Sequence, residues 1–186
     1  FFEDVSEERK NKYFIYVGNY CDRKNQELAL QAYYKAETGS IGFVFIGSSR
    51  NEYYEKLVHI NEDLQVKYGS KNVQILYGIP RERISEYTKE AYACVISSNY
   101  EYYPITIVEA LAAGIPFVST NVGIVRYLPG GIIANDCGDI SYWLEFLARN
   151  KEYKDGLGKM GKEYAQRNLT ISSKVELLDD IIKGRL

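Results

Sequence analysis

The chain has 186 residues, of which 46% are hydrophobic and 26% are charged, values typical of a globular domain. Dividing the length by about 150 residues per domain predicts a single domain over residues 1–186. The formal net charge of −2 gives no support for a nucleic-acid partner, and no apolar stretch approaches the roughly 18 residues of a membrane span.

Six short apolar runs, rich in β-branched and aromatic residues, predict β-strands that are buried on both faces. They lie at residues 13–17, 41–46, 72–76, 92–96, 116–118 and 131–134. Segments of mixed apolar and charged residues predict intervening helices at 25–38, 51–68, 81–91 and 104–114. This alternation predicts an α/β fold, a Rossmann-like doubly wound parallel sheet with helices on both faces and right-handed crossovers.

Three more helices are expected to close the chain, at residues 138–149, 151–167 and 173–184. Ser173 and Glu176 have the spacing of a capping box, which predicts that Ser173 caps the last helix. Gly156 to Lys162 imitates a phosphate-binding loop, but it ends in Glu163 and follows no predicted strand, so we reject that interpretation.

The amino-terminus and the cysteines bear on the compartment. The first eight residues are acidic where a signal peptide would be basic, and they lack an initiator Met, so we expect a piece of a longer protein. Cys21, Cys94 and Cys137 are widely spaced and odd in number, which favours reduced thiols. A cytoplasmic location is therefore expected.

Ligands of a doubly wound sheet bind outside the carboxyl ends of its strands. The predicted strands lead into polar or glycine-containing segments at residues 18–19, 47–49, 77–78 and 97–101. The polar material thus lies where a ligand site is expected, although many α/β domains share this feature.

The most informative segment is residues 97–116, SSNYEYYPITIVEALAAGIP. Pro104 suits the first turn of a helix, which places Glu101 in the preceding loop and Glu109 in the second helical turn. The packing face of this helix is expected to consist of Ile107, Val108 and Leu111, and the opposite face is small or polar. A carboxylate in so apolar a run needs a partner or a ligand. The alternative is a Glu that the helix dipole favours near an N-terminus.

This segment resembles the E-x7-E signature of retaining GT-B glycosyltransferases, glycosyltransferase family 4, with Glu101 and Glu109 as its acids. The resemblance extends over nearly the whole chain, as the carboxyl-terminal half of such an enzyme. It implies a domain that binds a UDP- or GDP-sugar, while an absent amino-terminal half supplies the acceptor side. We assign any peripheral membrane association to that absent half.

The resemblance also implies roles for single residues. Glu109 would accept hydrogen bonds from the ribose hydroxyls, and Glu101 would lie beside the donor sugar as a catalytic residue. Lys24 would neutralise the diphosphate as it leaves. The amides of Ile105 and Thr106 would hold the distal phosphate.

The remaining residues of the implied nucleotide-sugar site come from three loops. The backbone from Tyr77 to Ile79 would meet the base, and the other contacts would come from Gly18, Asn19, Tyr103 and Pro104. No Asp-x-Asp occurs, so neither a metal nor another cofactor is expected.

Several positions depart from the family pattern. Asn19 and Tyr127 stand where the family usually has Arg and Glu, while Tyr102 and Ile124 stand where it usually has Gly. Arg23 is a candidate to replace the missing cation. These departures bear on the donor identity and on activity.

Two other functions are alternatives to a glycosyltransferase. A nucleotide-sugar epimerase would need acid–base groups, and the single histidine, His59, belongs to a charged helix away from the expected cleft. A non-catalytic nucleotide-sensing domain is consistent with the departures at Asn19 and Tyr102. The absence of G-x-G-x-x-G after the first strand weakens a nicotinamide-binding interpretation.

Tyr100, Tyr102 and Tyr103 could stack on a sugar or simply pack.

Overall fold

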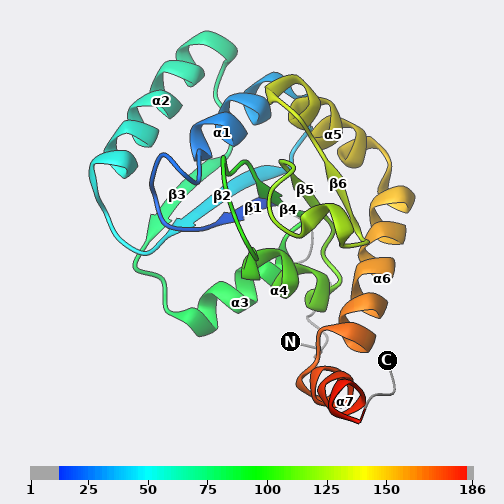
Figure 1. Ribbon diagram of the computed structural model, residues 1–186. Coiled ribbons are helices and arrows are strands. Elements are labelled where there is room, and N and C mark those ends of the chain that lie inside the picture. Colours follow the sequence, from blue (N-terminus) through cyan, green and yellow to red (C-terminus); the bar gives the residue numbers. More distant parts are fainter. Residues whose placement is uncertain (1–12, 184–186) are drawn as a thin grey trace.

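The computed structural model describes residues 13–183, which form a parallel six-stranded sheet between two layers of helices (Figure 1). The strand order is β3-β2-β1-β4-β5-β6. The strands are β1 (Tyr13–Val17), β2 (Gly42–Gly47), β3 (Val73–Tyr77), β4 (Ala93–Ile96), β5 (Phe117–Ser119) and β6 (Gly131–Ile133). All six predicted strands and the doubly wound fold are confirmed.

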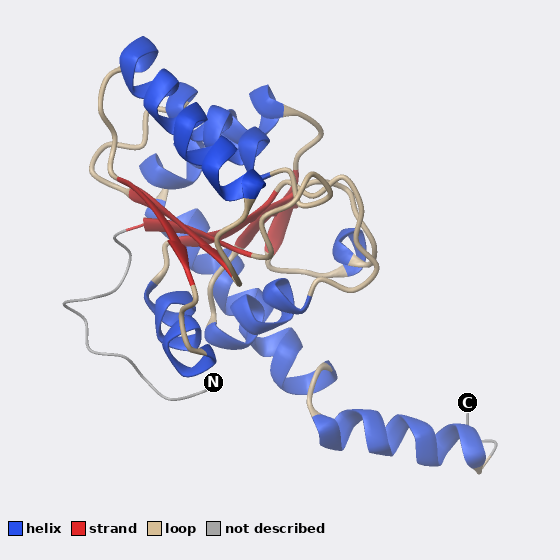
Figure 2. Cartoon of the chain, turned by 90° about the vertical axis from the view of Figure 1, so that its left-hand side faces the viewer, coloured by secondary structure: helices blue, strands red, loops and turns tan. Residues whose placement is uncertain are grey.

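The helices divide between the two faces of the sheet (Figures 1 and 2). One layer contains α1 (Gln26–Lys35), α2 (Glu52–Tyr68) and α5 (Cys137–Arg149). The other contains α3 (Arg81–Glu90), α4 (Ile105–Ala113) and α6 (Lys151–Asn168). The last helix, α7 (Ile171–Ile182), runs away from the sheet beyond α6.

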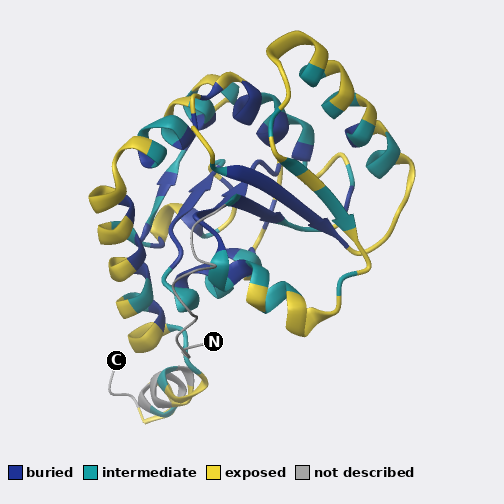
Figure 3. Cartoon of the chain, turned by 180° about the vertical axis from the view of Figure 1, so that it is seen from behind, coloured by how far each residue is buried: buried dark blue, intermediate teal, exposed yellow. Residues whose placement is uncertain are grey.

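The core is buried on both faces of the central strands, as their continuous apolar sequences require (Figure 3). Every residue of β2 is buried, and so is every residue of β4. Phe14, Phe43 and Tyr33 pack edge to face near the amino-terminal part of β1. Burial of this aromatic cluster anchors β1 at the centre of the sheet.

The order of the strands reverses between β1 and β4, which pair in parallel through Phe14 with Ala93 and Ile15 with Cys94. β2 and β3 extend the sheet on one side of β1, and β5 and β6 extend it on the side of β4. The loops that follow β1 and β4 therefore lie at the switch point of the carboxyl edge, where this class of fold binds ligands.

Two local predictions are corrected, and one element was not predicted. The cap of α7 is Thr170, whose hydroxyl accepts a hydrogen bond from the Ser173 amide, so the helix begins before Ser173. On α4 the buried face is Ile107, Ala110 and Leu111, a set that includes Ala110 in place of Val108. A 3-10 helix, η2 (Val125–Tyr127), was not predicted.

Two glycines of α6 explain the segment that imitates a phosphate-binding loop. A Cβ at Gly158 would lie 2.3 Å from the Gly114 carbonyl oxygen, and one at Gly161 would lie 2.5 Å from Leu111 Cδ2. The segment is helical, and these glycines let α6 approach α4 and its C-cap closely.

Neither a membrane-spanning helix nor a disulfide occurs among the described residues. Within residues 13–183, no helix is both long and apolar enough to cross a bilayer. The three cysteines are free, and burial raises the pKa of the Cys94 thiol to about 12. The acidic segment before residue 13 lies outside the described residues.

Candidate active site at the carboxyl edge of the sheet

The loop after β1 and the loop after β4 are joined by hydrogen bonds at the point where the strand order reverses. The Asn99 amide donates to the Arg23 carbonyl at 2.8 Å, and Ser97 Oγ donates to the Asn25 carbonyl at 2.6 Å. These contacts bring Lys24, from one loop, next to Glu101, from the other.

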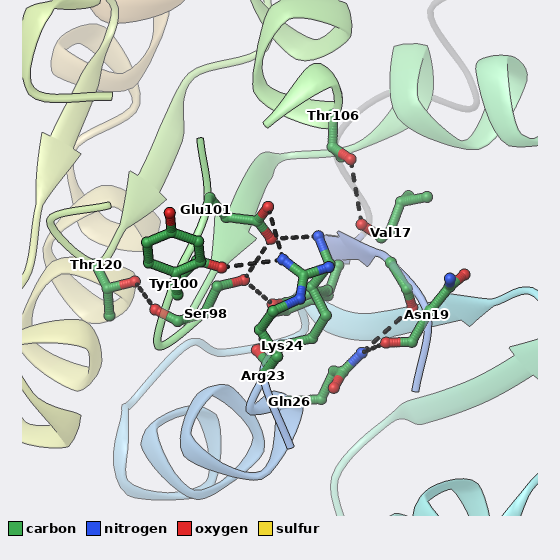
Figure 4. Close-up of polar contacts among 12 residues, drawn as sticks. Val17, Asn19, Arg23, Lys24, Gln26, Ser98, Tyr100, Glu101, Thr106 and Thr120 are labelled. Carbon is green, nitrogen blue, oxygen red and sulfur yellow. Dashed lines mark hydrogen bonds and ion pairs between the residues drawn. The ribbon is translucent and has the colours of Figure 1, made fainter. Parts of the chain in front are cut away.

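Glu101 lies at the centre of this junction and receives three donors (Figure 4). Lys24 Nζ donates to Oε1, and Ser98 Oγ donates to the same oxygen at 3.0 Å. Arg23 Nη1 donates to Oε2 at 3.0 Å. Glu101 is only 8% exposed, and the side chain of Lys24 is 14% exposed, whereas that of Arg23 is 49% exposed. Lys24 is thus the enclosed cation of the pair and Arg23 the open one.

The donors keep the buried carboxylate ionised. Burial by itself raises the pKa of Glu101, but the bonds from Lys24, Ser98 and Arg23 outweigh it and hold the pKa below its usual value. At neutral pH the site contains one carboxylate between two cations. Its formal charge is therefore positive, which suits an anionic ligand.

A second layer of hydrogen bonds fixes these side chains. The buried Tyr16 hydroxyl donates to the Lys24 carbonyl at 2.6 Å and lies 3.2 Å from Ser98 Oγ. Burial raises the pKa of Tyr16, so the phenol stays neutral. Thr120 Oγ1 donates to the Ser98 carbonyl at 2.7 Å, which ties the loop after β5 to the site.

Gln26 holds the loop after β1 and was missed by sequence reasoning. Its Nε2 donates to the carbonyls of Gly18 at 3.2 Å and Asn19 at 2.9 Å. The side chain is fully buried. A glutamine at the start of a helix, directly after a glycine loop, was the available signal, but exposed glutamines are far commoner.

The amino-terminus of α4 faces the end of β1. Thr106 Oγ1 donates to the Val17 carbonyl at 3.2 Å (Figure 4), and Ile105 is exposed beside it. The first amides of a helix have no carbonyl within the helix to bond, so these residues present donors at this edge. Pro104 is buried and precedes the helix as its cap residue, and Tyr103 is half exposed.

A cavity of about 370 Å³ opens at the carboxyl ends of β1, β2 and β3. Its walls include Gly18, Asn19, Gly78 and Ile79, four residues of the predicted nucleotide-sugar site. Tyr77 does not line it, because its half-exposed ring packs edge to face against Tyr54 at 5.2 Å.

Glu109 lies in a neighbouring hollow of about 250 Å³ between α3 and α4. Its Oε1 accepts a hydrogen bond from Arg81 Nη2 at 2.5 Å. Sequence reasoning missed this partner, because Arg81 is 28 residues away and belongs to another helix. Arg81 and Ile84 line both hollows, so Glu109 is adjacent to the larger cavity.

The other candidates lie apart from this edge. His59 is exposed on α2, with Nδ1 3.2 Å from Glu62 Oε2. Within residues 13–183, no group of three or more His, Cys, Asp or Glu side chains could hold a metal ion. The site therefore consists of a carboxylate between cations, a helix amino-terminus, a cavity and a second carboxylate beside it.

The fold is that of GT-B glycosyltransferase domains. The sequence matches the family described as glycosyl transferases group 1 over residues 1–129, and the chain belongs to this family. It is similar to an uncharacterized glycosyltransferase of Methanocaldococcus jannaschii, with 23% identity over 159 residues. That match covers 82% of the chain and 43% of the relative, so the chain spans less than half of the relative's length.

Solved structures share the fold at low sequence identity. Sucrose-phosphate synthase from Thermosynechococcus elongatus has a TM-score of 0.78 and 20% identity, over 95% of this chain and 46% of that one. HepE of Anabaena, solved with UDP and glucose, has a TM-score of 0.81 and 13% identity, over 94% of this chain and 49% of that one. The carboxyl-terminal domain of a group 1 family protein from Francisella tularensis has a TM-score of 0.76 and 16% identity, over 87% and 88%.

Proposed function

We propose that the chain is the carboxyl-terminal, donor-binding domain of a retaining glycosyltransferase that transfers a hexosyl group from a nucleoside diphosphate sugar. The observation that carries the proposal is the placement of Lys24, Arg23 and Glu101 beside the amino-terminus of α4, next to a cavity at the carboxyl edge. This edge then offers a positive phosphate site, a base pocket and a ribose acceptor.

Each part suits one part of the donor. The cavity at Gly78 and Ile79 takes the base, and Glu109 accepts from the ribose hydroxyls, since two carboxylate oxygens match two vicinal donors. Lys24 and the amides of Ile105 and Thr106 meet the diphosphate, an arrangement that binds anions at helix ends generally.

The proposed reaction requires stabilisation of a leaving diphosphate, and Lys24 is a fixed positive charge for that purpose. Lys24 is held by Glu101 and by the backbone bond from Tyr16, so little reorganisation is needed when charge develops. Glu101 lies beyond the phosphates, beside the sugar. Retention through a same-face displacement, in which the leaving phosphate assists the acceptor, is the chemistry that the family resemblance implies.

The proposed partners are a UDP- or GDP-sugar and the amino-terminal half of the same enzyme. UDP and glucose occupy the Anabaena structure that shares this fold. The chain covers less than half of the M. jannaschii relative but most of a carboxyl-terminal domain from F. tularensis. This difference supports a missing amino-terminal half. The acceptor-binding residues would then lie outside this chain, which alone should bind the donor and catalyse little.

A thermal-shift panel of UDP- and GDP-sugars tests the proposal. Ligand at about 100 times its Kd adds about 2.7 kcal/mol of stability, or roughly 5–11 °C in Tm for a domain of this size. We expect at least one sugar nucleotide to produce such a shift, with or without EDTA, because Lys24 and α4 meet the phosphates. No shift at millimolar concentrations would contradict the proposed function. Binding that chelation abolishes would contradict the proposed absence of a metal.

A further inference from the structure

The side chain of Arg81 stands between Glu109 and the cavity at the carboxyl edge. Arg81 and Ile84 are walls of both the 370 Å³ cavity and the 250 Å³ hollow, whereas Glu109 lines only the hollow. The guanidinium reaches across from the first turn of α3 to bond Glu109 Oε1 at 2.5 Å. A ligand in the cavity that is to reach the carboxylate therefore meets Arg81 first.

The two partners differ in their exposure to water. The Arg81 side chain is 77% exposed, and that of Glu109 is 18% exposed. Among the described residues, Arg81 makes this one ion pair, and nothing donates to the second oxygen of Glu109. A single contact to a largely exposed guanidinium is weak and is readily exchanged for water or another donor.

We infer that Arg81 competes with the nucleoside for Glu109 and so sets the affinity of the site. This inference rests on the proposed function, in which the ribose hydroxyls donate to Glu109. In this competition, a vicinal pair of hydroxyls that occupies both oxygens displaces the Arg81 donor from Oε1. Departure of the guanidinium also joins the hollow at Glu109 to the cavity, because Arg81 is part of the wall between them.

The competition has a distinctive consequence for salt dependence. A neutral nucleoside carries no charge for salt to screen, so its own contacts should be insensitive to ionic strength. Salt does weaken the exposed ion pair that the nucleoside must replace, since the Debye length falls from about 30 Å at 0.01 M to about 3 Å at 1 M. Nucleoside binding to the unmodified chain should therefore tighten as salt is added.

The experiment is calorimetric titration of the 186-residue chain with uridine, guanosine and adenosine at about 0.01 M and about 1 M NaCl. Phosphate-free probes leave Lys24 and Arg23 out of the comparison. We expect Arg81→Ala to bind the preferred nucleoside about two- to fivefold more tightly at low salt, the range that exposed ion pairs allow. The unmodified chain should approach the affinity of the variant at high salt.

Arg83 provides the matched control. It lies on the same helix, is exposed, and pairs with Glu86, but it lines neither hollow. Arg83→Ala should bind as the unmodified chain does at both salt concentrations. Arg81→Gln keeps much of the side-chain length without the charge and should behave as Arg81→Ala does, which covers the case of an unstable alanine variant.

The outcomes separate the inference from the proposed function. Weaker or unchanged nucleoside binding by both Arg81 variants at low salt would overturn the inference, since Arg81 would then favour nucleoside binding or have no effect on it. Equal salt dependence in the unmodified chain and Arg81→Ala would do the same. If no protein binds any nucleoside or nucleotide at millimolar concentration, the proposed function fails, and the inference fails with it.

Discussion

Glu101 is a buried carboxylate that stays charged because its donors come from two different loops. Lys24 and Arg23 follow β1, and Ser98 follows β4. Removal of the carboxylate would leave two cations close together with no acid between them. The same contacts that prepare the proposed chemistry therefore also hold the two loops together.

We predict that Glu101→Gln destabilises the domain at neutral pH by about 1–3 kcal/mol, the scale of hydrogen bonds to charged groups. The folded pKa of Glu101 is lowered, and the unfolded value is about 4.3. The extra stability is therefore fully present above the unfolded pKa and is lost as the pH falls through the lower folded pKa.

Urea unfolding of both proteins at a series of pH values measures this difference. Glu86→Gln, which removes an exposed partner of Arg83, is the control and should change stability little. Equal stability of Glu101→Gln and the unmodified domain at pH 7 would show that the three donors do not stabilise the fold. A difference that does not diminish at all as the pH falls below the unfolded pKa of about 4.3 would show that the carboxylate charge is not its source.

At the scale of single elements, the strands and helices followed from the sequence, and the contacts between helices did not. Continuous apolar runs predicted β2 and β4, because strands buried on both faces need apolar residues throughout. The pairing of Arg81 with Glu109 joins two helices, and no local pattern reports such a distance. Gln26 was missed because burial of a glutamine depends on acceptors from a loop that its own sequence does not reveal.

Local competition explains the errors at element ends. Thr170 and Ser173 are both good capping residues, and the spacing from Ser173 to Glu176 favoured the later one. The structure begins α7 at Ile171, so Thr170 is the residue that caps the first turn. The backbone from Tyr77 to Ile79 remains a predicted contact to the base, while the Tyr77 ring packs against Tyr54.

The glycines of α6 give a prediction at this scale. Gly158→Ala places a Cβ 2.3 Å from the backbone oxygen of Gly114, which cannot move without shifting the end of α4. We expect a loss of at least about 1 kcal/mol, because overpacking exceeds the gain in helix propensity. Gly156→Ala is the matched control in the same helix, where nothing lies within 4 Å of the added Cβ.

Gly156→Ala should stabilise the domain by about 0.5–1 kcal/mol, as replacement of an unhindered helical glycine does. The urea midpoints of the two variants measure both effects. If Gly158→Ala matches or exceeds the stability of the unmodified domain, α6 does not need its glycine to approach the C-cap of α4.

Under the proposed function, the whole molecule forms one half of a cleft. The domain presents Lys24, Glu101 and the start of α4 at one edge, and the chain spans less than half of its relative in M. jannaschii. The acceptor would enter from the other half. The chain as it stands should then bind a nucleotide sugar through two carboxylates with separate roles, one for the ribose and one for the sugar.

The most direct measurement is calorimetric titration of nucleoside diphosphate and of the matching nucleotide sugar into Glu109→Ala, Glu101→Ala and the unmodified chain. Glu109→Ala should lose at least about tenfold in affinity for both ligands, because one or two charged hydrogen bonds disappear. Glu101→Ala should affect the nucleotide sugar more than the nucleoside diphosphate. Glu62→Ala, an exposed carboxylate on α2, should change neither affinity. Unchanged nucleotide affinity in a folded Glu109→Ala domain would contradict the account.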